Sequence, residues 1–157
     1  IGARQVVEVG TLAGYSALRL ARGLPPDGHV HTIESEPRHA QVARQVIDAA
    51  SESRRITVHV GPGVDVLPSL ESRGPFCGVF IDADKESYPL YGRWAAQHLR
   101  RGGLLIADNV FLFGQLLDDT PRAAAMRLFH EEARQHFETV CIPTPDGLLL
   151  GIRRPFL

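Results

Sequence analysis

The chain has 157 residues, of which 44% are hydrophobic and 22% are charged, and this composition is typical of a single globular domain. Lysine and arginine number 17 against 18 for aspartate and glutamate, so the net charge of −1 argues against a dedicated nucleic-acid-binding protein. No apolar run approaches the ~20 residues that span a bilayer, and no signal peptide is recognisable. The two cysteines lie in separate apolar runs, so we expect them to be reduced, in a cytoplasmic protein without membrane association.

Short apolar runs alternate with amphipathic helical patterns along most of the chain. The expected strands lie at 5–10, 29–35, 56–61, 77–83 and 103–108, and the expected helices at 15–22, 37–50, 64–72, 87–99 and near 121–135. Continuous apolar strands separated by helices indicate a parallel sheet that is covered on both faces. The stretch "FETVCIPTPDGLLLGIRR" then predicts two strands joined by a tight turn, an antiparallel hairpin that ends one α/β domain.

The first strand leads into a glycine turn, "EVGTLAGYSA". Gly10 permits a tight turn and Gly14 a close approach, although Leu12 replaces the middle glycine of the G-x-G-x-x-G pattern of dinucleotide folds. Such a turn either presents helix N–H groups to a polar ligand or is only structural. Glu8 is a carboxylate within an apolar strand and therefore needs a partner, which is either a ligand or the neighbouring backbone N–H groups.

The next two strands end in residues that suit a nucleoside. Glu34 follows Gly14 by about 20 residues, and an acid at this place can accept hydrogen bonds from both ribose hydroxyls. The alternative is that Glu34 is a solvated loop acid. The third strand ends in "GPG" (61–63), small residues against which a flat base can lie. These strand ends predict a nucleoside pocket.

The fourth and fifth strands end in acids. Asp82 follows the fourth strand, and Asp108 and Asn109 follow the fifth. Neighbouring strands lie about 4.8 Å apart, so these three side chains can converge on a hard cation such as Mg²⁺ or Ca²⁺. The alternative is that Asp82 and Asp108 cap two helices separately. Lys85 can reach the same point and, with a lowered pKa, can serve as a general base.

Two pairs of residues remain open at this stage. His29 and His31 lie on the same face of one strand, but no third metal ligand with suitable spacing is evident, so a structural role is favoured. Tyr88 and Tyr91 either flank the pocket or pack in the core.

The motifs resemble those of a known family, the metal-dependent class I S-adenosylmethionine O-methyltransferases of the catechol and caffeoyl-CoA type. The matching stretches, in the family's order from about residue 4 to residue 154, are "VVEVGTLAGYSALRLA", "IESEP", "VGPGVDVLPSL", "FIDADKESYPLY", "GGLLIADNVFLFG" and "DGLLLGIRR". The resemblance implies a Rossmann-like α/β methyltransferase fold. Its mostly parallel seven-stranded sheet would have the order 3-2-1-4-5-7-6 and a C-terminal antiparallel hairpin.

The resemblance also implies a role for each matching residue. The residues implied to bind S-adenosylmethionine are Glu8, Gly10, Thr11 and Ser16 at its methionine end, Glu34 at its ribose, Gly63 at its adenine, Asp84 at its amino group, and Asp82. The implied metal ligands are Asp82, Asp108 and Asn109, with Mg²⁺ expected and Ca²⁺ or Mn²⁺ as alternatives. Lys85 would be the general base, with Asp82 beside it in the catalytic group.

The implied reaction is methyl transfer to a hydroxyl of a metal-chelated, catechol-type aromatic substrate. Phe111 and Phe113 would form part of the wall for the aromatic ring or belong to the core. Two alternatives are a cofactor-binding but inactive truncated domain and an NAD-dependent oxidoreductase. We expect residues 1–157 to form one methyltransferase domain that lacks the family's N-terminal helical segment. A homodimer is compatible with the family, whereas a nucleic-acid or membrane partner is not expected.

Overall fold

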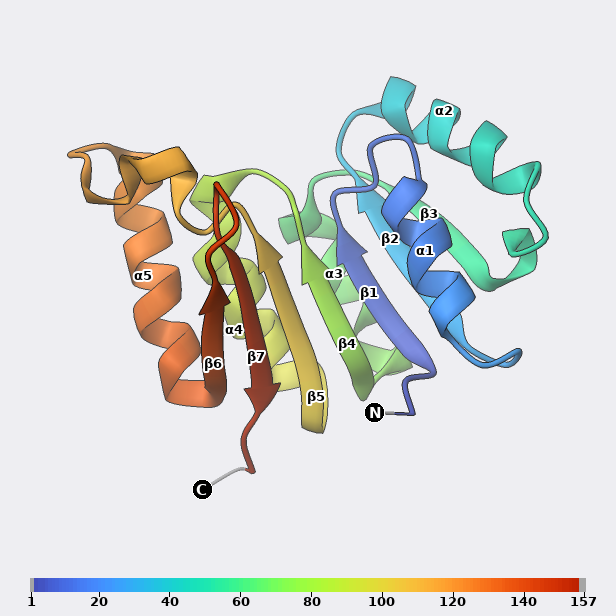
Figure 1. Cartoon of the computed structure of the whole chain (residues 1–157). Helices are drawn as coiled ribbons and strands as arrows, with labels where there is room; N and C mark the ends of the chain where they lie inside the picture. The colour runs from blue at the N-terminus through green and yellow to red at the C-terminus, as the bar shows by residue number, and fades with distance from the viewer. Residues whose placement is uncertain (1, 156–157) are drawn as a thin grey trace.

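The computed structural model describes residues 2–155, which are built around one seven-stranded sheet. The strands are β1 (Gln5–Val9), β2 (His29–Glu34), β3 (Ile56–Val60), β4 (Phe76–Ile81), β5 (Leu99–Asp108), β6 (Phe137–Ile142) and β7 (Leu148–Arg153). Their order across the sheet is β3-β2-β1-β4-β5-β7-β6 (Figure 1). The first five strands are parallel, whereas β7 is antiparallel to β5 and β6. The predicted strand order and the predicted hairpin are both confirmed.

Helices follow most of the strands, as the alternating pattern predicts. They are α1 (Tyr15–Gly23), α2 (Pro37–Asp48), α3 (Gly63–Leu70), α4 (Tyr88–His98) and α5 (Pro121–His136), with short 3-10 helices η1 (Ser53–Arg55), η2 (Glu71–Arg73), η3 (Lys85–Ser87) and η4 (Leu112–Leu117). Proline starts α2 and α5, and the preceding Glu36 and Thr120 accept hydrogen bonds from backbone N–H groups of the first turn. Proline is favoured there because the first helical N–H has no partner within the helix.

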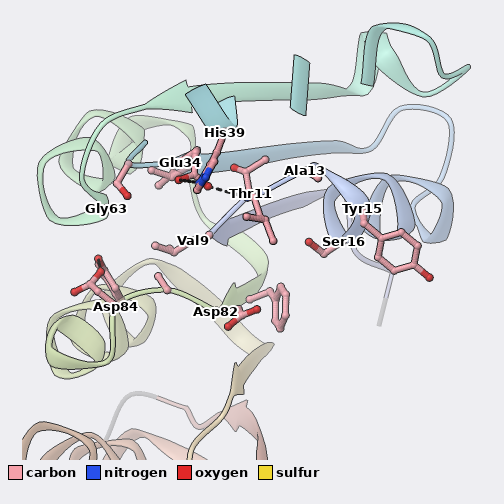
Figure 2. Close-up of a pocket in the computed structure, with 17 residues that line it drawn as sticks. Val9, Thr11, Ala13, Tyr15, Ser16, Glu34, His39, Gly63, Asp82 and Asp84 are labelled. Carbon is pink, nitrogen blue, oxygen red and sulfur yellow. Dashed lines mark hydrogen bonds and ion pairs between the residues drawn. The ribbon is translucent and has the colours of Figure 1, made fainter. Parts of the chain in front are cut away.

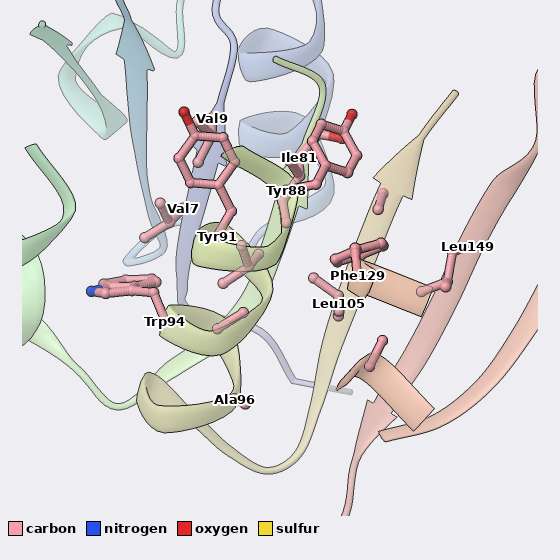
Figure 3. Close-up of a cluster of buried hydrophobic side chains, with 14 of the residues drawn as sticks. Val7, Val9, Ile81, Tyr88, Tyr91, Trp94, Ala96, Leu105, Phe129 and Leu149 are labelled. Atoms are coloured by element: carbon pink, nitrogen blue, oxygen red, sulfur yellow. The ribbon is translucent and has the colours of Figure 1, made fainter. Parts of the chain in front are cut away.

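The larger hydrophobic core lies between the sheet and the helices α3, α4 and α5. Tyr88 and Tyr91 of α4 are buried in this core, which also includes side chains of β1, β4 and β5 (Figure 3). The ring of Phe129 in α5 meets the Tyr88 ring edge-on, with 5.4 Å between the centroids. Such edge-to-face packing stabilises aromatic pairs beyond the burial of area alone. The core therefore holds α4 firmly below the carboxyl ends of β4 and β5.

The opposite face of the sheet is covered only in part. There α1 and α2 pack over β2 and β3 (Figure 1). Within residues 2–155 no helix covers β4, β5 and β7 on this side, and Phe80, Leu104, Ile106 and Leu148 remain half-buried. The expectation that both faces are covered therefore fails for these strands. The reason is topological, since every helix after β3 lies on the other side of the sheet.

Strand β5 is longer than predicted, because it begins at Leu99, directly after α4. Its pairing with β4 shifts register between Phe76, opposite Leu99, and Gly78, opposite Leu104. The register shift accommodates residues 100–103, "RRGG", a charged and glycine-rich stretch whose composition does not predict a strand. None of the helices in residues 2–155 has the length and apolar character needed to span a membrane.

Candidate active site

A cavity of about 550 Å³ lies at the carboxyl ends of β1, β2 and β4 (Figure 2). Its volume is within the usual range for small-molecule sites, and its place at the strand ends is where open α/β sheets bind ligands. The predicted cofactor residues that line it are Gly10, Thr11, Ser16, Glu34, Gly63, Asp82 and Asp84. Glu8 is not among the lining residues, because it is fully buried behind the glycine turn.

The glycine turn brings β1 against β4. Gly10 has φ +105, and a Cβ atom on it would lie 1.9 Å from the backbone oxygen of Asp82, so only glycine fits. Leu12 also has a positive φ, +48, which is costly for a residue with a side chain. Its backbone N–H donates a hydrogen bond of 2.7 Å to Oε2 of Glu34. Glu34 therefore helps to hold this turn around the cavity.

Glu34 is buried, so the alternative of a solvated loop acid is wrong. Its second oxygen, Oε1, accepts a 3.0 Å hydrogen bond from the backbone N–H of Glu36. Nδ1 of His39, at the rim of the cavity, lies 3.7 Å from the same oxygen. No pattern in the sequence selects His39, because its place depends on how α2 begins.

Glu8 belongs to a buried row of polar groups between β1 and β2. Thr32 lies opposite Glu8 in the strand register, and its hydroxyl donates to Oε2 of Glu8. Because that uses the single Thr32 proton, the 2.6 Å contact with Thr11 is donated by Thr11. The alternative that Glu8 caps backbone N–H groups is therefore wrong. The sequence analysis did not select Thr32. Its signal is a hydroxyl group on the strand that pairs with β1, at the position opposite the buried acid Glu8.

Burial raises the pKa of Glu8 to about 7, and the hydroxyls of Ser16 and Thr32 only partly oppose this effect. Oε1 of Glu8 is buried and has no hydrogen-bond partner among the described residues. A buried oxygen without a partner costs free energy, and a cationic ligand group nearby would relieve that cost. Ser16, which interacts with Glu8 and lines the cavity, is the link between Glu8 and a ligand.

At the other end of the cavity, α4 holds Asp84. The Tyr91 hydroxyl donates a 2.7 Å hydrogen bond to Oδ1 of Asp84. The Tyr91 ring lies directly against Gly63, where a Cβ atom would come within 2.8 Å of Cε1 of the ring and of Val9. Tyr91 therefore both packs in the core and lines the pocket, which resolves the two readings of this residue.

Lys85 is the only lysine of the chain, which otherwise uses arginine for its basic side chains. Its side chain is only 9% exposed, and Nζ lies 3.3 Å from Oδ1 of Asp82 and 2.6 Å from the hydroxyl oxygen of Tyr88. Burial lowers the pKa of Lys85, and the carboxylates of Asp82 and Asp108 oppose this shift. Lysine can lose its proton in such surroundings, whereas arginine cannot.

Asp108 and Asn109 lie at the end of the neighbouring strand. Burial raises the pKa of Asp108, the Asn109 N–H hydrogen bond opposes the shift, and the nearby charges of Asp82 and Asp146 add to it. Neither Asp82 nor Asp108 caps a helix. The N-cap residues of the helices that follow, η3, α4 and η4, are Asp84, Ser87 and Phe111. The helix-capping alternative is therefore wrong, and the two acids are near enough for the charge of Asp82 to act on Asp108.

Asp146, from the turn between β6 and β7, joins this group and was not selected from the sequence. The side-chain amide of Asn109 donates a hydrogen bond to Oδ2 of Asp146. Two carboxylates and an amide oxygen are ligands that hard cations prefer. Within residues 2–155 no three His, Cys, Asp or Glu side chains are grouped to hold a metal, so the amide of Asn109 would have to contribute.

The histidine pair of β2 lines neither of the cavities at the strand ends, and both rings contact side chains of β3. His29 Nε2 is 2.8 Å from the hydroxyl of Thr57, and His31 Nδ1 is 3.2 Å from Nε2 of His59. Burial lowers the pKa of His31 to about 4, so its ring is neutral at physiological pH.

A second cavity of about 480 Å³ adjoins the first on the open side of the sheet. Its lining residues are Tyr15, Ser16, Arg19, Leu20, Phe80, Ile106, Asp108 and Leu148. Tyr15, Ser16 and Phe80 line both cavities. Phe111 instead packs over Gly147, and Phe113 is 68% exposed, so neither lines this cavity.

Comparison with known proteins identifies the family. A family model described as O-methyltransferase matches residues 1–154. The chain belongs to the O-methyltransferase family. The resemblance inferred from the motifs is therefore confirmed.

Among the relatives, a catechol O-methyltransferase of Mycobacterium tuberculosis is 48% identical over 130 residues, which are 81% of this chain and 59% of that protein. A catechol O-methyltransferase of Niastella koreensis is 42% identical over 127 residues, 80% of this chain and 58% of that protein. The chain thus spans less than two thirds of the length of these curated relatives.

Solved members of the O-methyltransferase family have the same fold. The Streptomyces achromogenes O-methyltransferase TomG, in complex with S-adenosylmethionine, superposes with a TM-score of 0.90 at 34% identity, covering 98% of this chain and 74% of that one. The Bacillus cereus O-methyltransferase, in complex with S-adenosylhomocysteine, has a TM-score of 0.90 at 35% identity, with 98% and 75% covered.

Proposed function

We propose that this chain is the catalytic domain of an S-adenosylmethionine-dependent O-methyltransferase whose acceptor is a catechol-type aromatic held by a divalent cation. One observation carries the proposal: the two cavities meet along Tyr15, Ser16 and Phe80, with Asp82 lining the first and Asp108 the second. A methyl donor in the first cavity and an acceptor in the second would therefore meet where the two acids lie.

The first cavity fits S-adenosylmethionine, which supplies a methyl group on a positively charged sulfur atom. Ser16 and Glu8 would bind the ammonium of the methionine part, because the unpartnered oxygen of Glu8 suits a cation. Glu34 would accept from the ribose hydroxyls, since a carboxylate oxygen can accept more than one hydrogen bond. The absence of a side chain at Gly63 leaves room for the adenine beside Tyr91 and Asp84.

Asp82, Asp108 and Asn109 would hold the cation through oxygen atoms. Bound there, a divalent cation acts as a Lewis acid that lowers the pKa of a coordinated hydroxyl group. Phe80, Ile106 and Leu148 would pack against the aromatic ring of the acceptor, because they form an apolar wall beside Asp108. The two relatives named catechol O-methyltransferase support an acceptor with two adjacent hydroxyls.

Lys85 would accept the proton of the reacting hydroxyl. Nζ of Lys85 forms hydrogen bonds with Asp82 and Tyr88, so a further hydrogen-bonding position of this nitrogen is available to a substrate hydroxyl. Burial lowers the pKa of Lys85, which favours the neutral amine that a general base requires. The chain thus supplies a proton acceptor, and positions it beside the acids that would hold the acceptor oxygen.

The alternative of an NAD-dependent oxidoreductase has no support in the comparisons, which give O-methyltransferases with S-adenosylmethionine or S-adenosylhomocysteine. The alternative of an inactive binding domain differs from the proposal only in turnover. Binding of S-adenosylhomocysteine without any methyl transfer would favour the inactive domain.

The test is methyl transfer by the purified chain. We would incubate it with S-adenosylmethionine, Mg²⁺ and a panel of catechols, with and without EDTA, and detect methylated products by mass spectrometry. The proposal expects a mass gain of one methyl group that EDTA abolishes. Transfer that EDTA leaves unchanged would contradict the cation assignment. Absence of transfer together with binding of S-adenosylhomocysteine would favour the inactive domain.

A further inference from the structure

The turn between β6 and β7 closes over the loop that carries Asn109. Backbone hydrogen bonds join the two segments, from Val110 N to the Gly147 oxygen at 3.0 Å and from Phe111 N to the Asp146 oxygen at 2.7 Å. Gly147 has φ +79, and a Cβ atom on it would lie 2.4 Å from Cγ of Phe111. The turn therefore needs glycine at this place in order to approach the loop so closely.

The side chain of Asp146 makes a further contact, with the amide of Asn109. Nδ2 of Asn109 donates to Oδ2 of Asp146, and the Thr144 hydroxyl lies 3.4 Å from the other carboxylate oxygen. An ionised carboxylate can only accept hydrogen bonds. The Asn109 amide must therefore present its NH₂ group to Asp146, and this contact leaves its oxygen unused. Asn109 itself has φ +58, so its backbone is held in a conformation that few residues adopt.

We propose that Asp146 is a positioning residue that orients the Asn109 amide, so that its oxygen is available to the cation held by Asp82 and Asp108. This inference rests on the proposed function, and it adds a residue to it that acts through Asn109. Partners of metal ligands that fix their orientation typically change metal affinity by about 10- to 100-fold when they are removed. Without Asp146 the amide is free to turn, and its oxygen faces the cation for only part of the time.

Two other roles would produce the same contact. Asp146 could bind the cation directly or attract it by charge, since its charge already raises the pKa of Asp108. Asp146 could also only brace the turn, like the backbone hydrogen bonds around it. The three roles differ in whether the effect of Asp146 passes through Asn109.

A double-mutant cycle separates these roles. We would measure Mn²⁺ affinity by electron paramagnetic resonance for the unaltered chain, Asp146→Ala, Asn109→Ala and the double variant, all with S-adenosylhomocysteine present. Asp146→Asn is the conservative variant, because its amide oxygen can still accept from Asn109. Asp119→Asn is the matched control, since it removes an exposed carboxylate from the loop before α5. Binding of S-adenosylhomocysteine by titration calorimetry reports on the fold of every variant.

The proposal expects Asp146→Ala to weaken Mn²⁺ binding about 10- to 100-fold. It also expects Asp146→Asn to recover most of that loss, and Asp146→Ala to have no further effect once Asn109 is alanine. A further loss of Mn²⁺ affinity on adding Asp146→Ala to Asn109→Ala would show that Asp146 acts directly on the cation. Unchanged Mn²⁺ affinity in Asp146→Ala would show that Asp146 only stabilises the turn. Either result overturns the inference.

Failure of the proposed function has a different signature. If the unaltered chain binds S-adenosylhomocysteine but no Mn²⁺, the cation assignment fails and the role of Asp146 fails with it. If Asp146→Ala no longer binds S-adenosylhomocysteine, the cycle is repeated with Asp146→Ser, whose hydroxyl is compatible with the turn.

Discussion

The hydroxyl oxygen of Tyr88 lies 2.6 Å from Nζ of Lys85, below the surface where β4 and β5 end. The same hydroxyl is 2.8 Å from the backbone oxygen of Asp108 and 3.3 Å from that of Ile81. A tyrosine hydroxyl has one proton, so it donates to these carbonyl groups and accepts from Lys85. Burial raises the pKa of Tyr88, which keeps the hydroxyl neutral in this role. Tyr88 thus connects Lys85 to both strand ends.

Removal of that hydroxyl should loosen Lys85. In Tyr88→Phe the ring still fills its place in the core, but Lys85 loses one of its two partners and the buried carbonyl groups lose their donor. We expect the free energy of unfolding to fall by about 1–3 kcal/mol, the usual cost of a lost buried hydrogen-bond partner. We also expect a slower methyl transfer, with little change in S-adenosylhomocysteine affinity. Urea unfolding, turnover and calorimetry measure the three quantities. An unchanged unfolding free energy would contradict the role of this hydroxyl.

Replacement of Lys85 by arginine separates charge from proton transfer. Lys85→Arg keeps the positive charge beside Asp82, but a guanidinium group does not release its proton at physiological pH. Because positioned acid–base groups contribute about 10²- to 10⁴-fold, we expect turnover to fall by a factor in this range. Cofactor affinity should stay within about threefold, since Lys85 does not line the cofactor cavity. Near-normal turnover by this variant would remove Lys85 from the role of base.

The hydrogen bond from Tyr91 to Asp84 should support cofactor binding. Tyr91→Phe retains the ring against Gly63 but removes the hydrogen bond to the Asp84 carboxylate, which is exposed at the cavity edge. The net worth of one hydrogen bond, about 0.5–1.5 kcal/mol, corresponds to a loss in S-adenosylhomocysteine affinity of roughly two- to tenfold. Calorimetric titration measures it, and Asp84→Asn is the companion variant. Equal affinity of Tyr91→Phe and the unaltered chain would show that Asp84 needs no such support.

The buried carboxyl of Glu8 should make stability depend on pH. Its pKa is about 7 in the folded chain against an ordinary 4.5, so the folded state holds the proton more strongly than the unfolded state. The contribution of Glu8 to the free energy of unfolding should therefore be fully present below pH about 4.5 and should fall by roughly 3 kcal/mol as the pH rises to about 7.

The Glu8→Gln variant should lack this decline, because glutamine does not ionise. We would compare urea unfolding of both proteins between pH about 5 and pH about 8. The exposed residue Glu138 provides the control, Glu138→Gln, which should follow the unaltered chain. Parallel curves for the unaltered chain and Glu8→Gln would contradict the raised pKa.

The close approach of β1 and β4 should make Gly10 irreplaceable. A methyl group at Gly10 would meet a backbone oxygen, which cannot move aside as a side chain can, and φ +105 is unfavourable for alanine. Overpacking and backbone strain each cost about 1–3 kcal/mol, so we expect Gly10→Ala to lower the free energy of unfolding by roughly 2–6 kcal/mol. Gly23→Ala is the matched control, because nothing lies within 4 Å of its added methyl group. Equal stability of the two variants would refute the argument.

The sequence by itself determined the class of fold and most of the candidate site. Alternating apolar runs and helical patterns indicate a parallel α/β sheet, and the ends of such strands meet at one edge. That rule was enough to group Gly10, Glu34, Asp82 and Asp108, since each directly follows or ends a strand. The motif resemblance supplied the strand order and the family, both of which are confirmed.

Only the tertiary structure decided the partners of these residues. Thr32 faces Glu8 because β1 and β2 are paired in one register, and Asp146 reaches Asn109 because β7 turns back beside β5. Tyr88 reaches Lys85 because α4 is packed against the core at one particular rotation. Asn109 and Asp146 are 37 positions apart in the sequence, and Glu8 and Thr32 are 24 apart. Their side-chain directions follow from packing of the whole chain, which no local pattern of residues encodes.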